Sequence, residues 1–398
     1  MKKFFFNNII TPCYIIDKDI FEKNISNFKN SFKNDWGENI LFGYSIKTNH
    51  VQYLMEFAKQ IGMYAEAVSG DEYKLALNIG YDAREIIFNG PQKNEEDLLY
   101  ALTNGSIVNI DNESEIDIIE KKIHLLKKED LRLGLRINFD LESDCPNETT
   151  SGTEVSRFGI CLENGDFERC INRIKRLGIK VSGLHLHYSS KSRSLNIFKA
   201  LSEKAVEVIE KYGLKNDISY IDVGGGFFGG MQVKGKPEIY EYSKVICKSL
   251  KKILEPKDVL LILEPGASTI ATSTKYISKV INIRDIRNTR IVTIDGSNLH
   301  INPLMAQREP SYLVMNKRNN RIKKQILCGC TCMENDRLLS LENEYSLDID
   351  DYIIINNVGA YTMAFNSCFI NLPPNIYVIE NGGYKLVRSN EINIMLKI

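Results

Sequence analysis

The stretch Leu41-Phe42-Gly43-Tyr44-Ser45-Ile46-Lys47 is a short apolar run, typical of a buried strand, that ends abruptly on a lysine. A lysine at the end of such a strand, with apolar residues behind it, loses part of its hydration. Burial of this kind lowers the pKa of an amine and makes it a nucleophile toward carbonyl carbon atoms. Most strand-terminal lysines are simply solvated, so the role of Lys47 depends on the rest of the chain.

Seven more apolar runs follow, separated by longer segments in which apolar residues recur with helical spacing. The eight runs lie at 41–46, 63–68, 85–88, 106–110, 132–138, 180–186, 219–223 and 259–263. Eight strands that alternate with helices over roughly 240 residues predict an α/β domain of the (β/α)8 TIM-barrel type. An open, doubly wound sheet is the alternative, and the count of eight favours the barrel.

After about residue 266 the long helical spacers disappear. Turn signals such as Asp295-Gly296 and Asn381-Gly382-Gly383 separate the later apolar runs, which indicates an all-β domain. The segment 11–17 also resembles a strand, and we expect it to pair with this second domain. The predicted domains are therefore a barrel at 22–265 and a β-domain built from 1–21 and 266–398.

Composition excludes several classes of function. The 398 residues hold 51 basic and 51 acidic side chains, which argues against a nucleic-acid or membrane-surface partner. No apolar run approaches the roughly 18 residues of a membrane span, and the run Phe4–Phe6 is too short for a secretion signal. Nine scattered cysteines without a C-x-x-C pair favour a cytoplasmic location.

Barrel enzymes carry their chemistry at the C-terminal ends of the strands, and polar residues gather at those ends here. They include Lys47, Glu66, Ser69, Asn89, Arg136, Asn138, His185, His187, Asp222 and Glu264. Gly224, Gly225 and Gly226 follow the seventh strand, where barrels commonly bind phosphate. Without a Cβ in the way, we expect their backbone N–H groups to converge on an anion.

Two further positions suggest an aromatic cofactor. A carboxylate such as Glu264 keeps a pyridine nitrogen protonated. The alternative role for Glu264 is that of a buried structural partner of an Arg or Lys in the barrel. His185 and His187 alternate along a strand and face the same side, so they could bind a metal. We expect no metal, because no Asp/Glu-rich motif lies nearby in the sequence. We interpret His187 as stacked on a cofactor ring and His185 as a satisfied residue of the barrel core.

The C-terminal domain adds Cys328, Cys330 and Cys332, which we expect to share one strand face. Their spacing is unusual for zinc, so a single functional thiol at Cys332 is the preferred interpretation. Tyr361, after Gly359-Ala360, could donate its hydroxyl group to a phosphate.

Taken together, the chain resembles the fold type III amino-acid decarboxylases that depend on pyridoxal 5′-phosphate, the family of diaminopimelate and ornithine decarboxylases. The resemblance covers nearly the whole chain and keeps the order of the family's motifs. These motifs are Tyr44-Ser-Ile-Lys47-Thr-Asn, Ser156-Arg-Phe-Gly159, His185-Leu-His187, Gly224-Gly-Gly-Phe227, Glu264-Pro-Gly266, Cys332 and Gly359-Ala-Tyr361.

The resemblance implies a role for each matching position. Lys47 forms the Schiff base with the cofactor, His187 stacks on its ring and Glu264 pairs with its pyridine nitrogen. The implied phosphate ligands are Ser190, Gly224, Gly225, Gly226, Gly266 and Tyr361. Cys332 crosses a homodimer interface and returns a proton to Cα after carbon dioxide leaves, so the active sites are shared between subunits.

Two departures concern the substrate, for which we name Arg136, Glu334 and Tyr361 as candidate contacts. The family usually has Arg after Glu-Pro-Gly, where this chain has Ala267, and an acidic residue directly after the cysteine, where it has Met333. A carboxylated or conjugated amino acid from siderophore, antibiotic or polyamine-like metabolism therefore fits as well as the family's usual substrates. An amino-acid racemase and a non-catalytic regulatory homologue are the alternatives, and Glu264 favours the decarboxylase over the racemase.

Overall fold

The computed structural model describes residues 9–304, 310–315, 320–366 and 368–391. The chain divides into two compact units. One comprises Asn24–Ser268, and the other comprises Met1–Lys23 with Thr269–Ile398. Within the described residues, no helix is long and apolar enough to cross a membrane.

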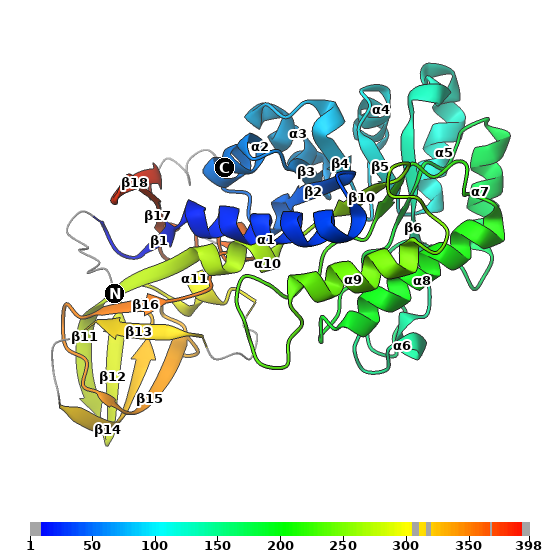
Figure 1. Ribbon diagram of the computed structural model, residues 1–398. Helices are drawn as coiled ribbons and strands as arrows, with labels where there is room; N and C mark the ends of the chain where they lie inside the picture. The colour runs from blue at the N-terminus through cyan, green and yellow to red at the C-terminus, as the bar shows by residue number, and fades with distance from the viewer. Residues whose placement is uncertain (1–8, 305–309, 316–319, 367, 392–398) are drawn as a thin grey trace. The chain divides into compact units, whose positions relative to one another are not determined.

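The first unit is a closed barrel of eight parallel strands, as the sequence predicts (Figure 1). The barrel strands are β2 (Ile40–Ser45), β3 (Tyr64–Ala67), β4 (Ile86–Phe88), β5 (Ile107–Ile110), β6 (Arg132–Asn138), β8 (Gly183–His185), β9 (Tyr220–Asp222) and β10 (Leu260–Leu263). Pairing of β10 with β2 closes the ring, and the short β7 (Ile160–Cys161) extends β6.

Helices alternate with the barrel strands, and the longer ones surround the barrel (Figure 1). They are α1 (Lys18–Trp36), α2 (Gln52–Gln60), α3 (Gly70–Ile79), α4 (Glu95–Thr103), α5 (Glu113–Lys122), α6 (Leu141–Asp144), α7 (Asp166–Arg176), α8 (Leu195–Tyr212), α9 (Ile239–Leu250) and α10 (Ala267–Ile270). Local sequence sets their ends. The Ser194 hydroxyl caps the start of α8, and Gly213 ends it in a left-handed conformation.

An aromatic cluster anchors the glycine-rich segment after β9. Phe227 is buried, and its ring stacks on Phe198 of α8 at 4.4 Å between centroids. Phe28 of α1 and Tyr242 of α9 contact the same ring edge-on. This packing fixes the chain directly after the triple glycine.

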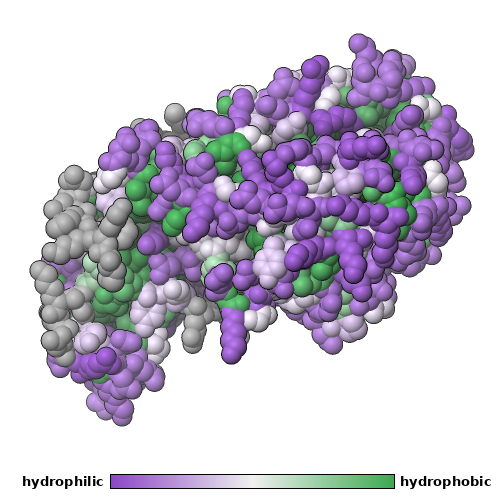
Figure 2. All heavy atoms as spheres, viewed as in Figure 1, coloured by the Kyte–Doolittle hydropathy of each residue, from purple (hydrophilic) through white to green (hydrophobic). Residues whose placement is uncertain are grey.

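By contrast, the face of the molecule in Figure 2 is mainly hydrophilic, with small separate apolar areas.

The second unit is mostly β-sheet. Its elements are β1 (Cys13–Ile16), β11 (Thr274–Ile286), β12 (Thr289–Ile294), α11 (Asn298–Ile301), β13 (Tyr312–Met315), β14 (Arg321–Cys328), β15 (Arg337–Tyr345), β16 (Tyr352–Ile355), β17 (Asn375–Glu380) and β18 (Gly383–Arg388). The prediction that the N-terminal segment pairs with this domain is confirmed. Strand β1 is antiparallel to β11 and parallel to β17, and all four of its residues are buried.

The prediction that three cysteines share a strand face is wrong. Strand β14 ends at Cys328, so Cys330 and Cys332 lie in the following turn. The buried Asp336 carboxylate holds this turn, because it accepts hydrogen bonds from the Thr331 hydroxyl at 2.6 Å and the Asn298 N–H at 2.7 Å. These hydrogen bonds stabilise a turn at 329–336, so the chain does not continue as an extended strand beyond Cys328.

Candidate active site

The C-terminal end of β2 carries Lys47, which lies in a short 3-10 turn, Ile46–Thr48. Its amine is 2.7 and 2.9 Å from the two carboxylate oxygens of Glu66, at the end of the neighbouring β3. Glu66 is fully buried, whereas about a third of the Lys47 side chain (32%) is exposed. The lysine therefore reaches solvent while a buried carboxylate stabilises its ammonium form, which opposes the effect of burial expected from the sequence.

Buried amide groups connect Glu66 to Glu264, which follows β10. The Asn89 amide donates to Glu66 at 3.2 Å and to Glu264 at 2.5 Å. Its oxygen accepts a hydrogen bond from Asn109 at 2.8 Å, and Asn109 also donates to Asp222 at 3.1 Å. A continuous set of hydrogen bonds thus joins Lys47, after β2, to Glu264, after the neighbouring strand β10.

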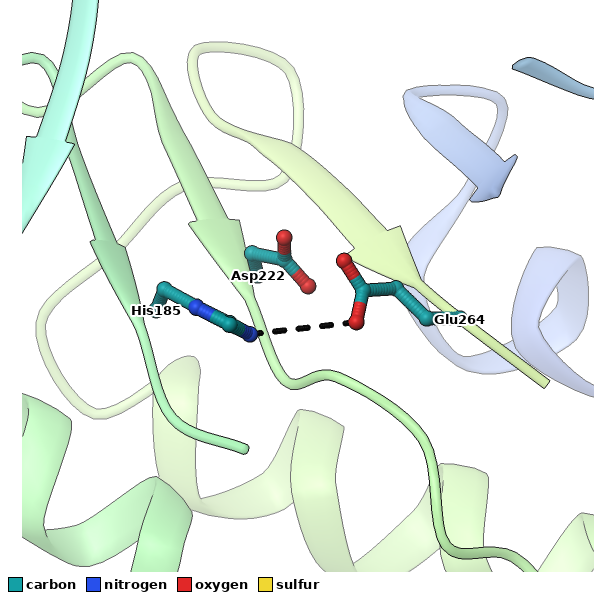
Figure 3. A group of neighbouring side chains, drawn as sticks. All are labelled: His185, Asp222 and Glu264. Atoms are coloured by element: carbon teal, nitrogen blue, oxygen red, sulfur yellow. Dashed lines mark ion pairs between the residues drawn. The ribbon is translucent and has the colours of Figure 1, made fainter. Parts of the chain in front are cut away.

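Glu264 faces two further buried residues, His185 at the end of β8 and Asp222 at the end of β9 (Figure 3). One ligand atom from each residue lies within 4.8 Å of the other two. Two carboxylates therefore lie beside His185, although no Asp/Glu-rich motif stands near it in the sequence. The carboxylates come from the end of β9, which lies next to β8 in the sheet, and from directly after β10, which lies next to β9.

His185 is buried, but the expectation that it is a satisfied core residue is wrong. Neither ring nitrogen has a hydrogen-bond partner within the described part of the chain. Its Nε2 is 3.8 Å from a Glu264 oxygen, which is beyond hydrogen-bond distance. Burial, with the Arg136 charge nearby, holds the pKa of His185 well below its ordinary value, so the ring is neutral.

His187 accepts a hydrogen bond from the Gly225 N–H through Nδ1, at 3.0 Å. Burial and the Arg136 charge also hold the pKa of His187 well below its ordinary value. The neutral ring therefore carries its hydrogen on Nε2. The rings of His185 and His187 lie near each other, with centroids 6.2 Å apart and an interplanar angle of 27°, although His187 lies beyond the end of β8.

Contrary to the prediction from the sequence, the three glycines after β9 do not all offer their backbone N–H groups to an anion. The Gly224 N–H donates to Asp222 at 2.9 Å and the Gly225 N–H donates to His187, so neither is available to an anion. The Gly226 N–H has no acceptor among the residues the structure describes, and it remains the candidate donor. The other two glycines are needed for close packing. A Cβ on Gly224 would lie 2.6 Å from His187 Cβ, and one on Gly225 would lie 2.4 Å from the Glu264 carbonyl oxygen.

Gly266 is similarly close-packed, because a Cβ there would lie 2.5 Å from Thr48 Oγ1. A cradle without side chains thus follows β9 and β10, next to a buried carboxylate and a partly exposed lysine. These residues fit a cofactor with an aldehyde, an aromatic ring and a phosphate. Lys47 would hold the aldehyde carbon, and Gly226 with the Gly266 segment would hold the phosphate.

Arg136 is engaged by the protein itself. Its guanidinium donates to Asp111 and to the His187 carbonyl, both at 3.0 Å. Its substrate role remains a prediction. Asn138 has a positioning role, because its amide donates to the carbonyls of Ser156 and Phe158 at 2.7 and 2.6 Å and holds the Ser156–Gly159 motif.

The Ser190 hydroxyl accepts the Arg193 N–H at 3.0 Å and is partly exposed. Three other predicted site residues belong to the second unit. Cys332 is exposed, and the Glu334 carboxylate is fully exposed, 3.6 Å from Arg337. Tyr361 is exposed and has a left-handed backbone, φ +60°. Their roles remain predictions.

From the sequence, Glu66, Asn89 and Asp222 are identified only by their positions at strand ends, and Asn109 is not identified. An available signal was an asparagine inside the apolar run Ile107-Val-Asn-Ile110, because a buried strand amide needs buried partners.

Comparison with known proteins places the site in context. The model of the family "Pyridoxal-dependent decarboxylase, pyridoxal binding domain" matches residues 18–271. A probable chloroplastic diaminopimelate decarboxylase from Oryza sativa subsp. japonica is 26% identical, over 96% of this chain and 78% of its own. The diaminopimelate decarboxylase of Aquifex aeolicus is 25% identical, over 96% and 89%.

Among solved structures, the Helicobacter pylori diaminopimelate decarboxylase in complex with L-lysine gives a TM-score of 0.83 at 24% identity, covering 98% of this chain and 97% of that one. The Paramecium bursaria Chlorella virus arginine decarboxylase bound to agmatine gives 0.78 at 22% identity, covering 94% and 97%. These likenesses establish a shared fold.

Proposed function

Because the chain belongs to the family of pyridoxal-dependent decarboxylases, we propose that it decarboxylates an amino acid with a second carboxyl or amide group at its far end, such as diaminopimelate. It is a decarboxylase that uses pyridoxal 5′-phosphate, and the relatives described above are named as decarboxylases and not as racemases. The observation that carries the proposal is Lys47 linked through Glu66 and Asn89 to Glu264, beside the glycine cradle.

Pyridoxal phosphate, when bound, withdraws electrons from the Cα of an attached amino acid, so that its carboxylate leaves as carbon dioxide. The residues of this chain supply the setting. Lys47 offers the amine that attaches the cofactor. When that amine is free and protonated, Glu66 forms an ion pair with it. Glu264 supplies the negative charge for the pyridine nitrogen, and the neutral His187 offers a flat, uncharged surface.

The substrate proposal rests on two features. The relatives at 25–26% identity are named diaminopimelate decarboxylases, and Met333 offers no charge for the simple ammonium group of ornithine or lysine. We propose that Glu334 contacts the far end of the substrate in its place, with Arg136 and Tyr361 as further contacts.

We also propose a cytoplasmic homodimer in which Cys332 serves the partner's active site and returns a proton to Cα. Support comes from exposed large apolar side chains between positions 361 and 370, namely Tyr361, Phe365, Phe369 and Ile370. All nine cysteines are free thiols, which fits a reducing compartment.

The first test is borohydride reduction of the protein loaded with its cofactor, followed by peptide mass mapping. The label should fall on Lys47 and be absent from Lys47→Ala. The matched control Lys252→Ala changes an exposed lysine paired with Glu203, and it should keep both label and activity. A label on any other lysine contradicts the assignment.

The second test measures carbon dioxide release from meso-diaminopimelate, ornithine, lysine, arginine and N-carboxyalkyl derivatives of these, with products identified by mass spectrometry. A site built to pair a charged group rejects substrates that lack it. Glu334→Gln should therefore reduce kcat/KM for the preferred substrate by about tenfold or more and leave cofactor affinity unchanged. Efficient ornithine decarboxylation that is indifferent to Glu334→Gln refutes the substrate proposal.

A further inference from the structure

Asp222 and Glu264 place two carboxyl groups side by side inside the barrel (Figure 3). Asp222 is fully buried, and only 3% of Glu264 is exposed. Asp222 ends β9 and Glu264 follows the adjacent parallel strand β10, and a carboxylate oxygen of each lies within 4.8 Å of the other. Two buried carboxylates this close repel each other strongly unless one of them carries a proton or a cation lies beside them.

The residues around the pair do not supply the positive charge that two ionised carboxylates would need for balance. The groups that donate to the pair are neutral: the Gly224 N–H and the Asn109 amide for Asp222, and the Asn89 amide for Glu264. Asp222 forms no ion pair within the described residues. Glu264 has only the neutral His185 at 3.8 Å.

The nearest cations are already engaged elsewhere. Lys47 pairs with Glu66, and Arg136 pairs with Asp111. Two adjacent buried carboxylates without a cation cannot both ionise at neutral pH.

We propose that Asp222 and Glu264 share one proton, that Asp222 holds it, and that the neutral Asp222 carboxyl group donates a hydrogen bond which keeps Glu264 ionised and oriented. Asp222 is therefore a positioning residue for Glu264. The benefit to catalysis rests on the function proposed above, whereas the shared proton does not.

The difference between the two environments decides which residue holds the proton. Asp222 is the more deeply buried, and its donors are at 2.9 and 3.1 Å, whereas Glu264 receives an amide at 2.5 Å. Burial, reinforced by the Glu264 charge, raises the pKa of Asp222 well above its ordinary range. The pair then carries a single negative charge on Glu264, the residue that would meet a pyridinium nitrogen.

The direct test is infrared spectroscopy of the purified holoenzyme at pH 8, in H2O and D2O. The wild type should show the C=O stretching band of a protonated carboxyl group, shifted in D2O, and Asp222→Asn should lack it. Asp258→Asn, an exposed aspartate just before β10, should keep the band. A carboxyl region that is identical in wild type and Asp222→Asn overturns the proposal.

Kinetics provide the second test. The side-chain amide that Asp222→Asn introduces is neutral and can still donate to Glu264. This variant should therefore keep kcat within about tenfold, whereas Asp222→Ala should lose about a hundredfold with little change in KM. Equal loss in both would show that an ionised Asp222 is required and would overturn the proposal. If Asp222→Ala does not fold, the infrared comparison and the Asp222→Asn kinetics still decide it.

His185, Asp222 and Glu264 could also bind a divalent cation, because their ligand atoms lie within 4.8 Å. One equivalent of metal in the purified protein, whose removal makes the carboxyl band appear, would overturn the shared proton. The outcomes also separate this inference from the substrate proposal, since the band requires no substrate.

Discussion

Glu264 is the residue at which the charge of the site can be changed with the least change in shape. In Glu264→Gln the side-chain amide oxygen can still accept the hydrogen bond from Asn89, but the negative charge of the carboxylate is lost. We expect cofactor affinity to stay within about tenfold and kcat to fall by about a hundredfold to a thousandfold, as for loss of other preorganised electrostatic groups. Cofactor titration and single-turnover kinetics measure the two effects.

The control is Glu255→Gln, at an exposed glutamate on the loop before β10, which should behave as wild type. A Glu264→Gln enzyme with normal kcat would mean that the carboxylate does not govern the chemistry.

Glu72 makes the stability of the fold depend on pH. Burial raises its pKa to about 7, although the Val68 N–H opposes the shift. Because the folded-state pKa is above that of the unfolded chain, the folded protein binds this proton more tightly. The stabilisation is complete below about pH 4.5 and is lost as the pH rises through about 7.

We therefore expect Glu72→Gln, relative to wild type, to gain stability by on the order of 2 kcal/mol between pH 5 and pH 8. Urea unfolding at the two pH values measures the difference. The exposed Glu96→Gln on α4 should follow wild type at both. Parallel curves for Glu72→Gln and wild type would mean that Glu72 is already ionised at pH 5.

At the scale of elements, the turn after β9 works by close packing. Gly224 has φ +67°, and an added Cβ would meet His187 at 2.6 Å. Gly224→Ala should displace His187 and weaken cofactor binding by about tenfold or more, on top of roughly 1 kcal/mol for the left-handed backbone.

Gly213 provides a matched control, because it has φ +64° but nothing within 4 Å of an added Cβ. Gly213→Ala should cost similar backbone strain and leave the cofactor dissociation constant unchanged. Equal cofactor affinities in Gly224→Ala and Gly213→Ala would show that close packing at Gly224 does not matter for cofactor binding.

The elements that sequence predicts well are those defined by apolar runs, and all eight barrel strands belong to this group. Strand β15 escaped prediction because it mixes polar and apolar residues irregularly, and it is held to β14 partly by the Lys324–Glu342 pair. Residues at strand ends could likewise be predicted to lie at the barrel mouth. The pairings Lys47–Glu66 and Asp222–Glu264 could not, because they depend on strand neighbours and side-chain reach that periodicity does not encode.

At the scale of the whole molecule, the proposed homodimer predicts complementation between inactive chains. Lys47→Ala lacks the attachment amine and Cys332→Ala lacks the proposed proton donor. If each site takes Lys47 from one chain and Cys332 from the other, randomly mixed dimers should recover about a quarter of wild-type activity.

Activity assays after mixing, unfolding and refolding together measure the recovery, and each variant alone is the control. A fully active monomer in sedimentation, or no recovery when hybrid dimers are present, contradicts shared sites.

Strand β1 has a consequence for how the protein is made. It is synthesised before the barrel strands, yet both of its partners, β11 and β17, are synthesised after them. A nascent chain therefore has to keep these four apolar residues unpaired while the whole barrel segment is synthesised. Premature termination before β17 would leave this strand with one open edge, which is a template for association with other chains.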